Sequence, residues 1–474
     1  MTLTTPWEDR RVRLAQMLRA AGGGVAVLPT AAERTRNADT DFPYRHDSHF
    51  HYLTGFDEPH AWLLLDASGT ATLLCRAKDP QREIWDGLRL GPEAAPAVLH
   101  VQAAFDVEAL DAVLTERLAD QPAVWFTFGG PTGTDAVSTR VEGCLAGLRA
   151  RSRSGVQSPP QLRDLAPLLA ELRLIKDADE LAVMRRAAAI SAGAHARAMR
   201  FCGARFRAAP DAGVAEYEIE AELLHEFRRH GAQSPAYPSI VAAGANACVL
   251  HYAAGNTRLR AGELCLIDAG CELDGYASDI TRTFPANGRF SAPQRQLYDI
   301  VLAAQQAAVI ATRPGARQRD AHHAAVRVLS AGLLDCGLLD RRVVGDVDAV
   351  VESAAYRQFY MHGTGHWLGR DVHDVGEYLA LDEEPGEQVD SSGRKALMRP
   401  SRRLQPGMVV TVEPGLYVRA AAGVPEHFWN IGIRIEDDAV VTASGCELIS
   451  RGVPVQADAI EALMAEELES GARA

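Results

Sequence analysis

Five potential metal ligands lie in the C-terminal half of the sequence, each in its own local context: Asp268, Asp279, His366, Glu413 and Glu436. Four carboxylates and one imidazole are too few donors to build two separate closed sites. They are about right for two divalent cations that share bridging carboxylates and keep open positions for water. The set therefore predicts a dinuclear metal centre, and it indicates metal-assisted hydrolysis.

The segment that contains the two aspartates is predicted to be a β-hairpin. We expect its turn at residues 272–275, which places Asp268 directly opposite Asp279. Opposed residues hold their Cβ atoms about 4.5–5.5 Å apart, and two carboxylates this close raise one another's pKa unless a cation lies between them. An aspartate pair is more often a solvated face of an exposed hairpin. Here the apolar flanks LCLI and ITRTF indicate burial and favour the metal.

Glu436 and Glu413 each follow an apolar run. Glu436 shares one face of a predicted strand with Arg434, because isoleucines occupy the other face. Such a pair alone is most simply a surface ion pair; the alternative is that Arg434 fixes a ligating carboxylate. Glu413 ends MVVTV and precedes Pro414, which holds it extended. It suits a metal ligand or a proton shuttle, and an ordinary strand end fits the local pattern equally well.

Three histidines fall in one glycine-containing segment, residues 362–373, which we call the histidine loop: His362, His366 and His373. The glycines let the backbone approach a ligand closely and favour a loop over a helix. A single histidine, such as His251, is usually structural, whereas a cluster of three is more typical of a functional site. The sequence contains no GxSxG, HExxH, CxxC or P-loop pattern, so no other catalytic arrangement competes.

The composition is that of an ordinary globular protein, with 474 residues, 47% hydrophobic and 23% charged. We expect no membrane span and no signal peptide, because no apolar run approaches about 20 residues and the first residues are charged. Eight cysteines without a CxxC pair indicate free thiols in a reducing compartment, so we expect a cytoplasmic protein. The net charge of −13 argues against binding to nucleic acid or to anionic membranes.

The length predicts two domains. Helix-like and strand-like segments alternate over residues 7–150, and the Ser-, Gly- and Pro-rich stretch 151–163 is the best linker candidate. Residues 379–403 are polar and rich in turn formers, which predicts an exposed insertion. The sequence contains a weak internal repeat, in which DAG and EPG are each followed by a second strand that carries another acid. This repeat predicts two pseudo-symmetric halves with the metals between them.

Four segments, IDAGCELDGYASDITRTFP, HGTGHWLGRDVHDVG, VVTVEPGLYV and IGIRIEDD, closely resemble the metal-binding segments of the pita-bread metallopeptidases. That family includes aminopeptidase P, prolidase and methionine aminopeptidase, alongside the metal-free creatinase. The segments DFPYRHDSHFHYLTGFDEPHAWLLL and EIWDGLRLGPEAAP resemble the amino-terminal domain of aminopeptidase P. The resemblance implies an α/β (α+β) fold, with a smaller creatinase-like N-terminal domain over 1–172 and a pita-bread catalytic domain over 173–474.

The resemblance also implies how the ligands are shared. Asp268 would chelate one manganese ion, His366 and Glu413 would hold the other, and Asp279 and Glu436 would bridge the two. Manganese suits a carboxylate-rich donor set, although zinc or cobalt could use the same ligands.

Other positions match residues that surround the substrate in the family. His251 and His373 resemble the cleft histidines that contact the substrate and assist proton movement. His362, Arg434 and Tyr417 match positions in the substrate pocket or behind the ligands.

The resemblance further implies an assembly of several copies. Asp39 and Trp85 lie in segments that, in bacterial aminopeptidase P, reach the active site of a neighbouring subunit. A homotetramer, or at least a dimer, is therefore expected. The insertion at 379–403 departs from the family pattern, so the cleft rim and the assembly are the features it would alter.

The expected activity is removal of the N-terminal residue from peptides with proline in second position. A hydroxide held by both metals would attack the Xaa-Pro carbonyl while Glu413 handles the proton; proline specificity rests on the resemblance alone. The alternative within the class is prolidase, which shares all five ligands but cleaves Xaa-Pro dipeptides. A non-catalytic pita-bread binding module and a creatinase-like amidinohydrolase are disfavoured, because such relatives lose the ligands and this chain keeps them.

Overall fold

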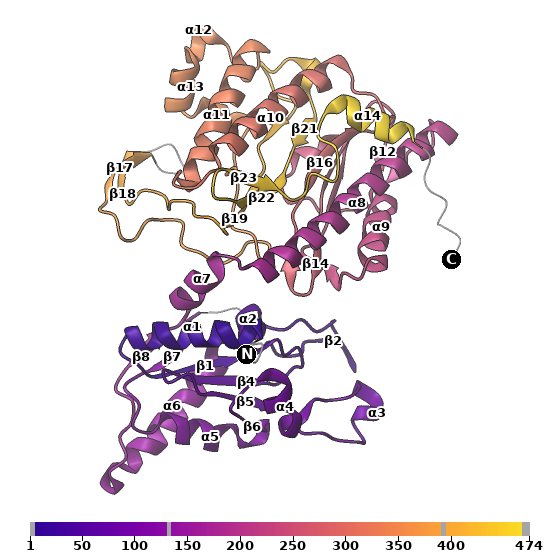
Figure 1. Ribbon diagram of the computed structural model, residues 1–474. Helices are drawn as coiled ribbons and strands as arrows, with labels where there is room; N and C mark the ends of the chain where they lie inside the picture. Colours follow the sequence, from indigo (N-terminus) through magenta and orange to yellow (C-terminus); the bar gives the residue numbers. More distant parts are fainter. Residues whose placement is uncertain (1–4, 130–133, 390–394, 467–474) are drawn as a thin grey trace. The chain divides into compact units, whose positions relative to one another are not determined.

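The computed structural model describes residues 5–129, 134–389 and 395–466 (Figure 1). The chain forms two compact units, residues 1–173 and 174–474. Helices and strands are mixed in both units, which confirms the predicted α/β (α+β) class. No described helix is long and apolar enough to cross a membrane. All eight cysteines are free thiols.

The N-terminal unit is built on one six-stranded sheet. In spatial order its strands are β6 (Ala103–Asp106), β5 (Ala71–Cys75), β4 (Trp62–Asp66), β1 (Val25–Pro29), β7 (Val124–Phe126) and β8 (Leu162–Asp164). Apolar residues alternate between two core layers, one packed on α1 (Pro6–Ala20) and the other on α5 (Leu110–Leu118) and α6 (Thr134–Ala150). Helices therefore cover both faces of this sheet (Figure 1).

The remaining elements of this unit are short. They are β2 (Thr35–Asn37), β3 (Thr40–Asp41), α2 (Ser48–Thr54), α3 (Glu83–Asp86), α4 (Gly91–Leu99) and α7 (Ala166–Leu174). The linker prediction was wrong, because residues 151–163 lie inside the first compact unit, and their C-terminal end overlaps β8, which pairs in parallel with β7. A three-residue strand after two prolines carries too little apolar pattern to be recognised in the sequence.

The C-terminal unit contains three three-stranded sheets among its described residues. The smallest consists of β10 (Ser234–Pro235), β14 (Cys271–Leu273) and β15 (Tyr276–Ala277), and the other two are larger. One consists of β11 (Ile240–Ala243), β13 (Leu264–Asp268) and β16 (Thr281–Pro285); the other consists of β19 (Val409–Val412), β22 (Asp437–Val441) and β23 (Cys446–Leu448). A ribbon of β20 (Gly415–Val418) and β21 (Ile431–Arg434) follows β19. The same arrangement thus occurs twice, since an antiparallel partner returns to each of β13 and β19.

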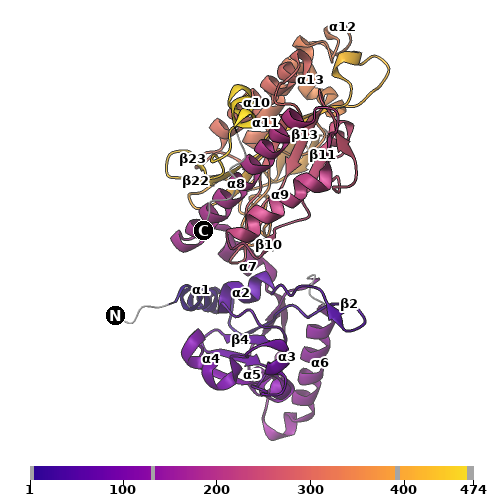
Figure 2. The same ribbon diagram turned by 90° about the vertical axis from the view of Figure 1, so that its right-hand side faces the viewer.

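Long helices pack on these sheets around one large core. Helix α8 (Ala178–Ala208) lies beside α9 (Glu216–Arg229), and α10 (Ala292–Ala311) lies beside α11 (Gln318–Asp335), as Figures 1 and 2 show. A cap lies at the start of α8: the Asp177 side chain accepts from the Glu180 N–H at 2.9 Å, and the Glu180 carboxylate accepts from the Asp177 N–H. Such a reciprocal capping box fixes where a helix begins.

The shorter elements of this unit complete its frame. They are β9 (Val214–Ala215), β10 (Ser234–Pro235), β12 (Arg258–Leu259), β14 (Cys271–Leu273), β15 (Tyr276–Ala277), α12 (Arg341–Val344), α13 (Val347–Glu352) and α14 (Ala457–Ala465).

The predicted register of the aspartate hairpin was wrong by two residues. Asp268 pairs with Thr281, not with Asp279, and the turn is centred on Asp274 and Gly275. Both turn residues have positive φ, 51° and 75°. Two consecutive left-handed residues make the tight two-residue turn that matches strand twist, and Asp-Gly is a typical sequence for it. The turn therefore lies one residue later than predicted.

The predicted insertion contains a β-hairpin of β17 (Gly386–Val389) and β18 (Lys395–Met398). Its base is attached to the start of α11: the Arg317 guanidinium forms an ion pair with the Glu383 carboxylate at 2.5 Å and donates to the Ser401 carbonyl. Residues 390–394 of the insertion lie outside the described residues.

Candidate metal centre

Three of the predicted ligands converge directly. One ligand atom each from Asp279, His366 and Glu436 lie within 4.8 Å of one another. Asp279 lies two residues before the first residue of β16, Glu436 immediately precedes β22, and His366 comes from the histidine loop. The returning strands of the two sheets thus carry acids to the same point.

Asp268 joins this group through a tyrosine. The Tyr237 hydroxyl lies 2.6 Å from Asp268 Oδ1 and also contacts Asp279 Oδ1. One hydroxyl hydrogen cannot serve two carboxylates at once. Two buried carboxylates that share one donor leave negative charge uncompensated, which a cation between them would neutralise.

Glu413 completes the set from the end of β19. Its N–H donates to the Thr364 carbonyl at 2.9 Å, and the His366 N–H donates to Thr411 Oγ1 at 3.1 Å. These bonds attach the histidine loop to β19. As a result, Glu413 Oε1 lies 3.7 Å from His366 Nε2.

The electrostatics of the carboxylates fit bound cations. Burial raises the pKa of Glu413 to about 7, only partly offset by His366 and Arg434. Burial and the charges of Asp279 and Glu413 raise the pKa of Glu436 well above its usual range. Burial and the Asp268 charge likewise raise the pKa of Asp279. Buried oxygen donors that lack enough positive charge are the environment that divalent cations stabilise.

The orientation of His366 also fits a metal ligand. Its Nδ1–H donates to the Trp367 carbonyl at 3.0 Å, so the lone pair of the neutral ring is on Nε2. Nε2 lies 3.4 Å from Asp279 Oδ2. A backbone carbonyl that fixes the tautomer in this way is typical of metal-binding histidines. Without a cation, the hydrogen bond to Asp279 and the Glu413 charge outweigh burial and raise the pKa of His366 to about 9.

Arg434 contacts three groups of the site and does not form a surface ion pair, since it is 4% exposed. Its Nη2 donates to Asp268 Oδ2 at 2.5 Å, and its Nη1 donates to the Tyr417 hydroxyl at 2.9 Å. Its Nε donates to Thr281 Oγ1, which in turn donates to Glu436 Oε2 at 2.5 Å. The guanidinium therefore orients carboxylates on both sheets.

His362 faces both Glu413 and Tyr417. Its Nε2 lies 2.8 Å from the Tyr417 hydroxyl, and its Nδ1 lies 3.7 Å from Glu413 Oε2. Burial, followed by the Arg434 charge, lowers the pKa of His362 to about 3. A neutral imidazole at this position can exchange hydrogen bonds with a bound carbonyl or amine.

His373 and His251 are more exposed. The His373 ring lies edge-on to His366, with ring centroids 4.2 Å apart. Burial lowers the pKa of His373, and the charges of His366 and His251 lower it further. His251, His366 and His373 therefore lie near one another at the site.

The last two predicted positions belong to the N-terminal unit. Asp39 lies in the turn between β2 and β3, and Trp85 lies on α3 with 83% of its surface exposed.

The sequence analysis missed several residues that support the predicted ligands. Tyr237, Thr281, His195 and Asp438, whose carboxylate accepts from the Asp279 N–H, carry no local signal. His195 Nε2 donates to the Ala269 carbonyl at 3.0 Å from the middle of α8. Each contact joins segments far apart in sequence, so no local pattern could have identified them.

Comparison with known proteins places these features in a family. The model of metallopeptidase family M24 matches residues 182–443, and the model of the aminopeptidase P N-terminal domain matches residues 7–125. The chain belongs to metallopeptidase family M24, and membership of a metallopeptidase family implies divalent metal ions. This result confirms the predicted pita-bread metallopeptidase with a smaller N-terminal domain.

Individual relatives are similar over nearly their full length. The Xaa-Pro aminopeptidase of Escherichia coli K12 is 42% identical over 96% of this chain and 97% of its own. Among solved structures, the Pseudomonas aeruginosa aminopeptidase PepP has a TM-score of 0.87 at 43% identity and covers 98% of this chain and 99% of its own. Proline aminopeptidase P II of Yersinia pestis has a TM-score of 0.86, also at 43% identity, and covers 97% and 99%.

Proposed function

We propose that this chain is a metal-dependent Xaa-Pro aminopeptidase, which releases the N-terminal residue from peptides with proline in second position. The observation that carries the proposal is the convergence of the acids and His366 in a chain of family M24. Full-length similarity to Xaa-Pro aminopeptidases supports the substrate class. In this proposal residues 1–172 form the aminopeptidase P N-terminal domain and residues 173–474 form the catalytic domain.

Five residues would hold two divalent cations: Asp268, Asp279, His366, Glu413 and Glu436. The chemistry supplied by the bound cations is Lewis-acid activation of the scissile carbonyl and of the attacking water. Manganese is the proposed metal, because four of the five donors are carboxylates. One solved relative is a zinc-substituted E. coli aminopeptidase P in complex with product, so related ligand sets accept zinc as well.

Glu413 is the proposed proton carrier. Burial holds its pKa at about 7 in the metal-free site, and its Oε2 faces His362. A carboxylate at this position can take a proton from the nucleophile and return it to the proline nitrogen. The proline nitrogen needs that proton, because it carries no hydrogen in the peptide and leaves as an amine.

The surrounding side chains are proposed to hold the substrate. His362, Tyr417 and Arg434 form a connected hydrogen-bonded group beside Glu413. Side chains fixed in this way can orient the scissile carbonyl without moving. His251 and His373 are exposed enough to reach a bound peptide and donate to its carbonyl groups.

Prolidase is the second candidate. A human Xaa-Pro dipeptidase is 35% identical over 96% of this chain and 92% of its own. The higher identity to the Xaa-Pro aminopeptidases of E. coli and Haemophilus influenzae, 42% and 41%, favours the longer substrate. Turnover of Xaa-Pro-Yaa peptides and of Xaa-Pro dipeptides, with and without added manganese and followed by mass spectrometry, tests the proposal. Cleavage of dipeptides alone would contradict it, and so would metal-independent turnover.

We also propose a cytoplasmic homo-oligomer, tetramer or dimer, in which Asp39 and Trp85 of one copy approach the active site of another. The exposed apolar residues Ile84, Trp85 and Leu88, each more than 80% exposed, support a contact surface around α3. Apolar side chains clustered at the surface commonly mark interfaces. Analytical ultracentrifugation of the wild type and of Trp85→Ala tests this part; a monomeric wild type would contradict it.

A further inference from the structure

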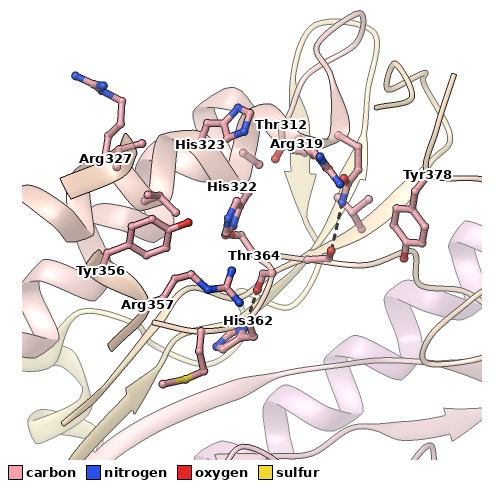
Figure 3. Close-up of a pocket in the computed structure, with 18 of the residues that line it drawn as sticks. Thr312, Arg319, His322, His323, Arg327, Tyr356, Arg357, His362, Thr364 and Tyr378 are labelled. Atoms are coloured by element: carbon pink, nitrogen blue, oxygen red, sulfur yellow. Dashed lines mark hydrogen bonds between the residues drawn. The ribbon is translucent and has the colours of Figure 1, made fainter. Parts of the chain in front are cut away.

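A cavity of about 840 Å³ lies on the side of the histidine loop where α11 and α13 pack. We call it the loop cavity; Figure 3 shows it between the α11 histidines and His362. Its lining includes the apolar side chains of Val326, Val351 and Met361. A cavity of this size with an apolar wall and a few polar groups is typical of a small-molecule site.

The loop cavity carries a surplus of positive charge. Arg319, Arg327, Arg357 and Lys395 line it, against two acidic residues, Asp348 and Glu352. Asp348 pairs with Arg327 at 2.7 Å, and Lys395 pairs with Glu387, outside the cavity lining, at 3.5 Å. Figure 3 shows Arg357 pointing toward Thr364 and His362. This surplus occurs in a chain of net charge −13, so it is a local feature that an anion would complement.

The hydrogen bonds at the cavity wall determine which nitrogen of His322 carries hydrogen. Thr364 Oγ1 lies 2.6 Å from the Tyr360 hydroxyl and 2.8 Å from His322 Nδ1. Tyr360 is fully buried, and Thr364 Oγ1 is the only hydrogen-bond partner of its hydroxyl among the described residues. A buried donor left unpaired costs about 1–3 kcal/mol, so Tyr360 donates to Thr364 and Thr364 donates to His322 Nδ1.

This order leaves the His322 hydrogen on Nε2, on the opposite side of the ring. Burial, followed by the nearby charges of His323, Arg319 and Arg357, lowers the pKa of His322 to about 4, so the ring stays neutral. A neutral imidazole N–H beside two guanidinium groups donates to an anion and repels a cation. The occupant must therefore be an acceptor with negative charge.

We propose that the loop cavity binds a small organic carboxylate with an apolar body, and that its occupancy acts on the histidine loop through His322 and Thr364. Arg357 and Arg319 would hold the carboxylate together with His322 Nε2–H, and Val326, Val351 and Met361 would contact the apolar body. Thr364 lies between His362 and His366, so a ligand that moves His322 also moves the segment carrying both histidines. The binding part of this inference does not depend on the proposed peptidase activity.

N-acetyl-leucine is a suitable probe, because it has a carboxylate and an apolar side chain and lacks a free amino terminus. Its matched control is N-acetyl-leucinamide, which has the same shape without the charge. Calorimetry with the full chain should show binding of the acid, with the amide at least about tenfold weaker, because charge-assisted hydrogen bonds are roughly twice as strong as neutral ones. Equal binding of acid and amide, or no binding of the acid at millimolar concentration, would overturn the proposal.

Two arginine variants locate the site. Arg357→Met keeps the length of the side chain but removes the charge, and it should weaken binding of the acid at least about tenfold. Arg341→Met removes an exposed arginine on α12, paired with Asp335 and absent from the cavity lining, and should change binding less than about twofold. Val351→Phe, which fills the cavity, should also abolish binding. Unchanged binding in both cavity variants would place the probe elsewhere and overturn the assignment.

The coupling is tested separately. Saturating N-acetyl-leucine should change kcat for an Xaa-Pro-Yaa peptide at least about twofold in the wild type. In Thr364→Val the acid should still bind but kcat should no longer respond; a wild-type kcat that does not respond would contradict the coupling. The C-terminal carboxylate of a peptide substrate is a second source of the same chemistry. If the C-terminal carboxylate of the substrate occupies the loop cavity, N-acetyl-leucine should compete with peptides that end in a free carboxylate. It should not compete with the same peptides as C-terminal amides.

Discussion

The acids at the ends of β13 and β19 occupy matching places in the repeated arrangement of the C-terminal unit, yet they differ in charge state. The Arg434 guanidinium and the hydrogen bonds from Tyr237 and Arg434 outweigh burial and lower the pKa of Asp268. Burial raises the pKa of Glu413 to about 7. Without bound cations, the ionised form is therefore favoured at Asp268 and the protonated form is favoured at Glu413.

One residue accounts for most of this difference. The acid next to the returning strand is Asp279 in the first half and Glu436 in the second. The residue two positions before that acid is Ala277 in the first half and Arg434 in the second. Arg434 donates across to Asp268, whereas the methyl group of Ala277 offers no donor to Glu413 in return. One side of the site is therefore neutralised by the protein itself, while bound cations would neutralise the other side, which Asp279, Glu413 and Glu436 form. The predictions below test that division.

The largest effect is expected for Glu436→Gln, which keeps the shape of the side chain and removes one charge from the unneutralised side. Peptidase activity should fall about 1,000-fold, equivalent to about 4 kcal/mol. The amide can still accept from Thr281, so local hydrogen bonding is retained. Metal content, measured by inductively coupled plasma mass spectrometry, should fall with activity. Full metal content with full activity would remove Glu436 from the site.

The second prediction concerns pH. Glu413 has a raised pKa in the metal-free fold, so the native state binds a proton that the unfolded chain releases between about pH 4.5 and 7. The contribution of Glu413 to stability is present below pH 4.5 and is lost as pH rises through 7. The loss amounts to about 3 kcal/mol, since each pKa unit is worth about 1.4 kcal/mol.

Denaturant unfolding of the metal-free protein at pH 5 and pH 8 measures this loss. Glu413→Gln should remove it, so the difference between wild type and variant isolates one carboxyl from the other titrating groups. Asp268→Asn is the matched comparison on the neutralised side. Its contribution has the opposite sign, because a lowered pKa adds stability as pH rises. Equal pH profiles for Glu413→Gln and the wild type would contradict the division.

Arg434 is the third target. Arg434→Met should lower kcat/KM about 100-fold, equivalent to about 2.7 kcal/mol, because it leaves Asp268 buried without its cation. Arg434→Lys keeps the charge, but one ammonium cannot reach Asp268, Tyr417 and Thr281 as the guanidinium fork does. Steady-state kinetics of both variants separate charge from geometry. If the lysine variant retains full activity, charge alone explains the role of Arg434.

Much of the candidate site could be predicted from the sequence, for a physical reason. Each acid sits at the end of an apolar run, and apolar runs fold into buried strands whose ends meet. The meeting of Asp279, Glu436 and His366 follows from that pattern. Their roles as ligands stay predictions, as do those of Asp268 and Glu413.

What could not be predicted depends on contacts between distant segments or on turn geometry. Tyr237 contacts Asp268 and Asp279, which come 31 and 42 residues later in the chain. The hairpin register depended on whether Asp274 accepts a left-handed conformation, which it does. The β8 strand exists because β7 offers an unpaired edge, a fact that no window of sequence around residues 162–164 contains.

The smallest effect in this series is expected for Thr281→Val, on the link between the two sides. Thr281 Oγ1 accepts from Arg434 Nε and donates to Glu436 Oε2, so it transmits the orientation of the neutralised side to the other. Valine has nearly the same shape and removes only these two bonds. Loss of a supporting hydrogen bond of this kind typically lowers metal affinity or activity about 10-fold to 100-fold. For Thr281→Val we expect kcat/KM to fall about 10-fold, because Arg434 still contacts Asp268 directly. Thr283→Val provides the control, since Thr283 Oγ1 bonds only the Arg434 backbone among the described residues. Equal losses in kcat/KM for the two valine variants would show that packing, and not the Thr281 link, couples the two sides.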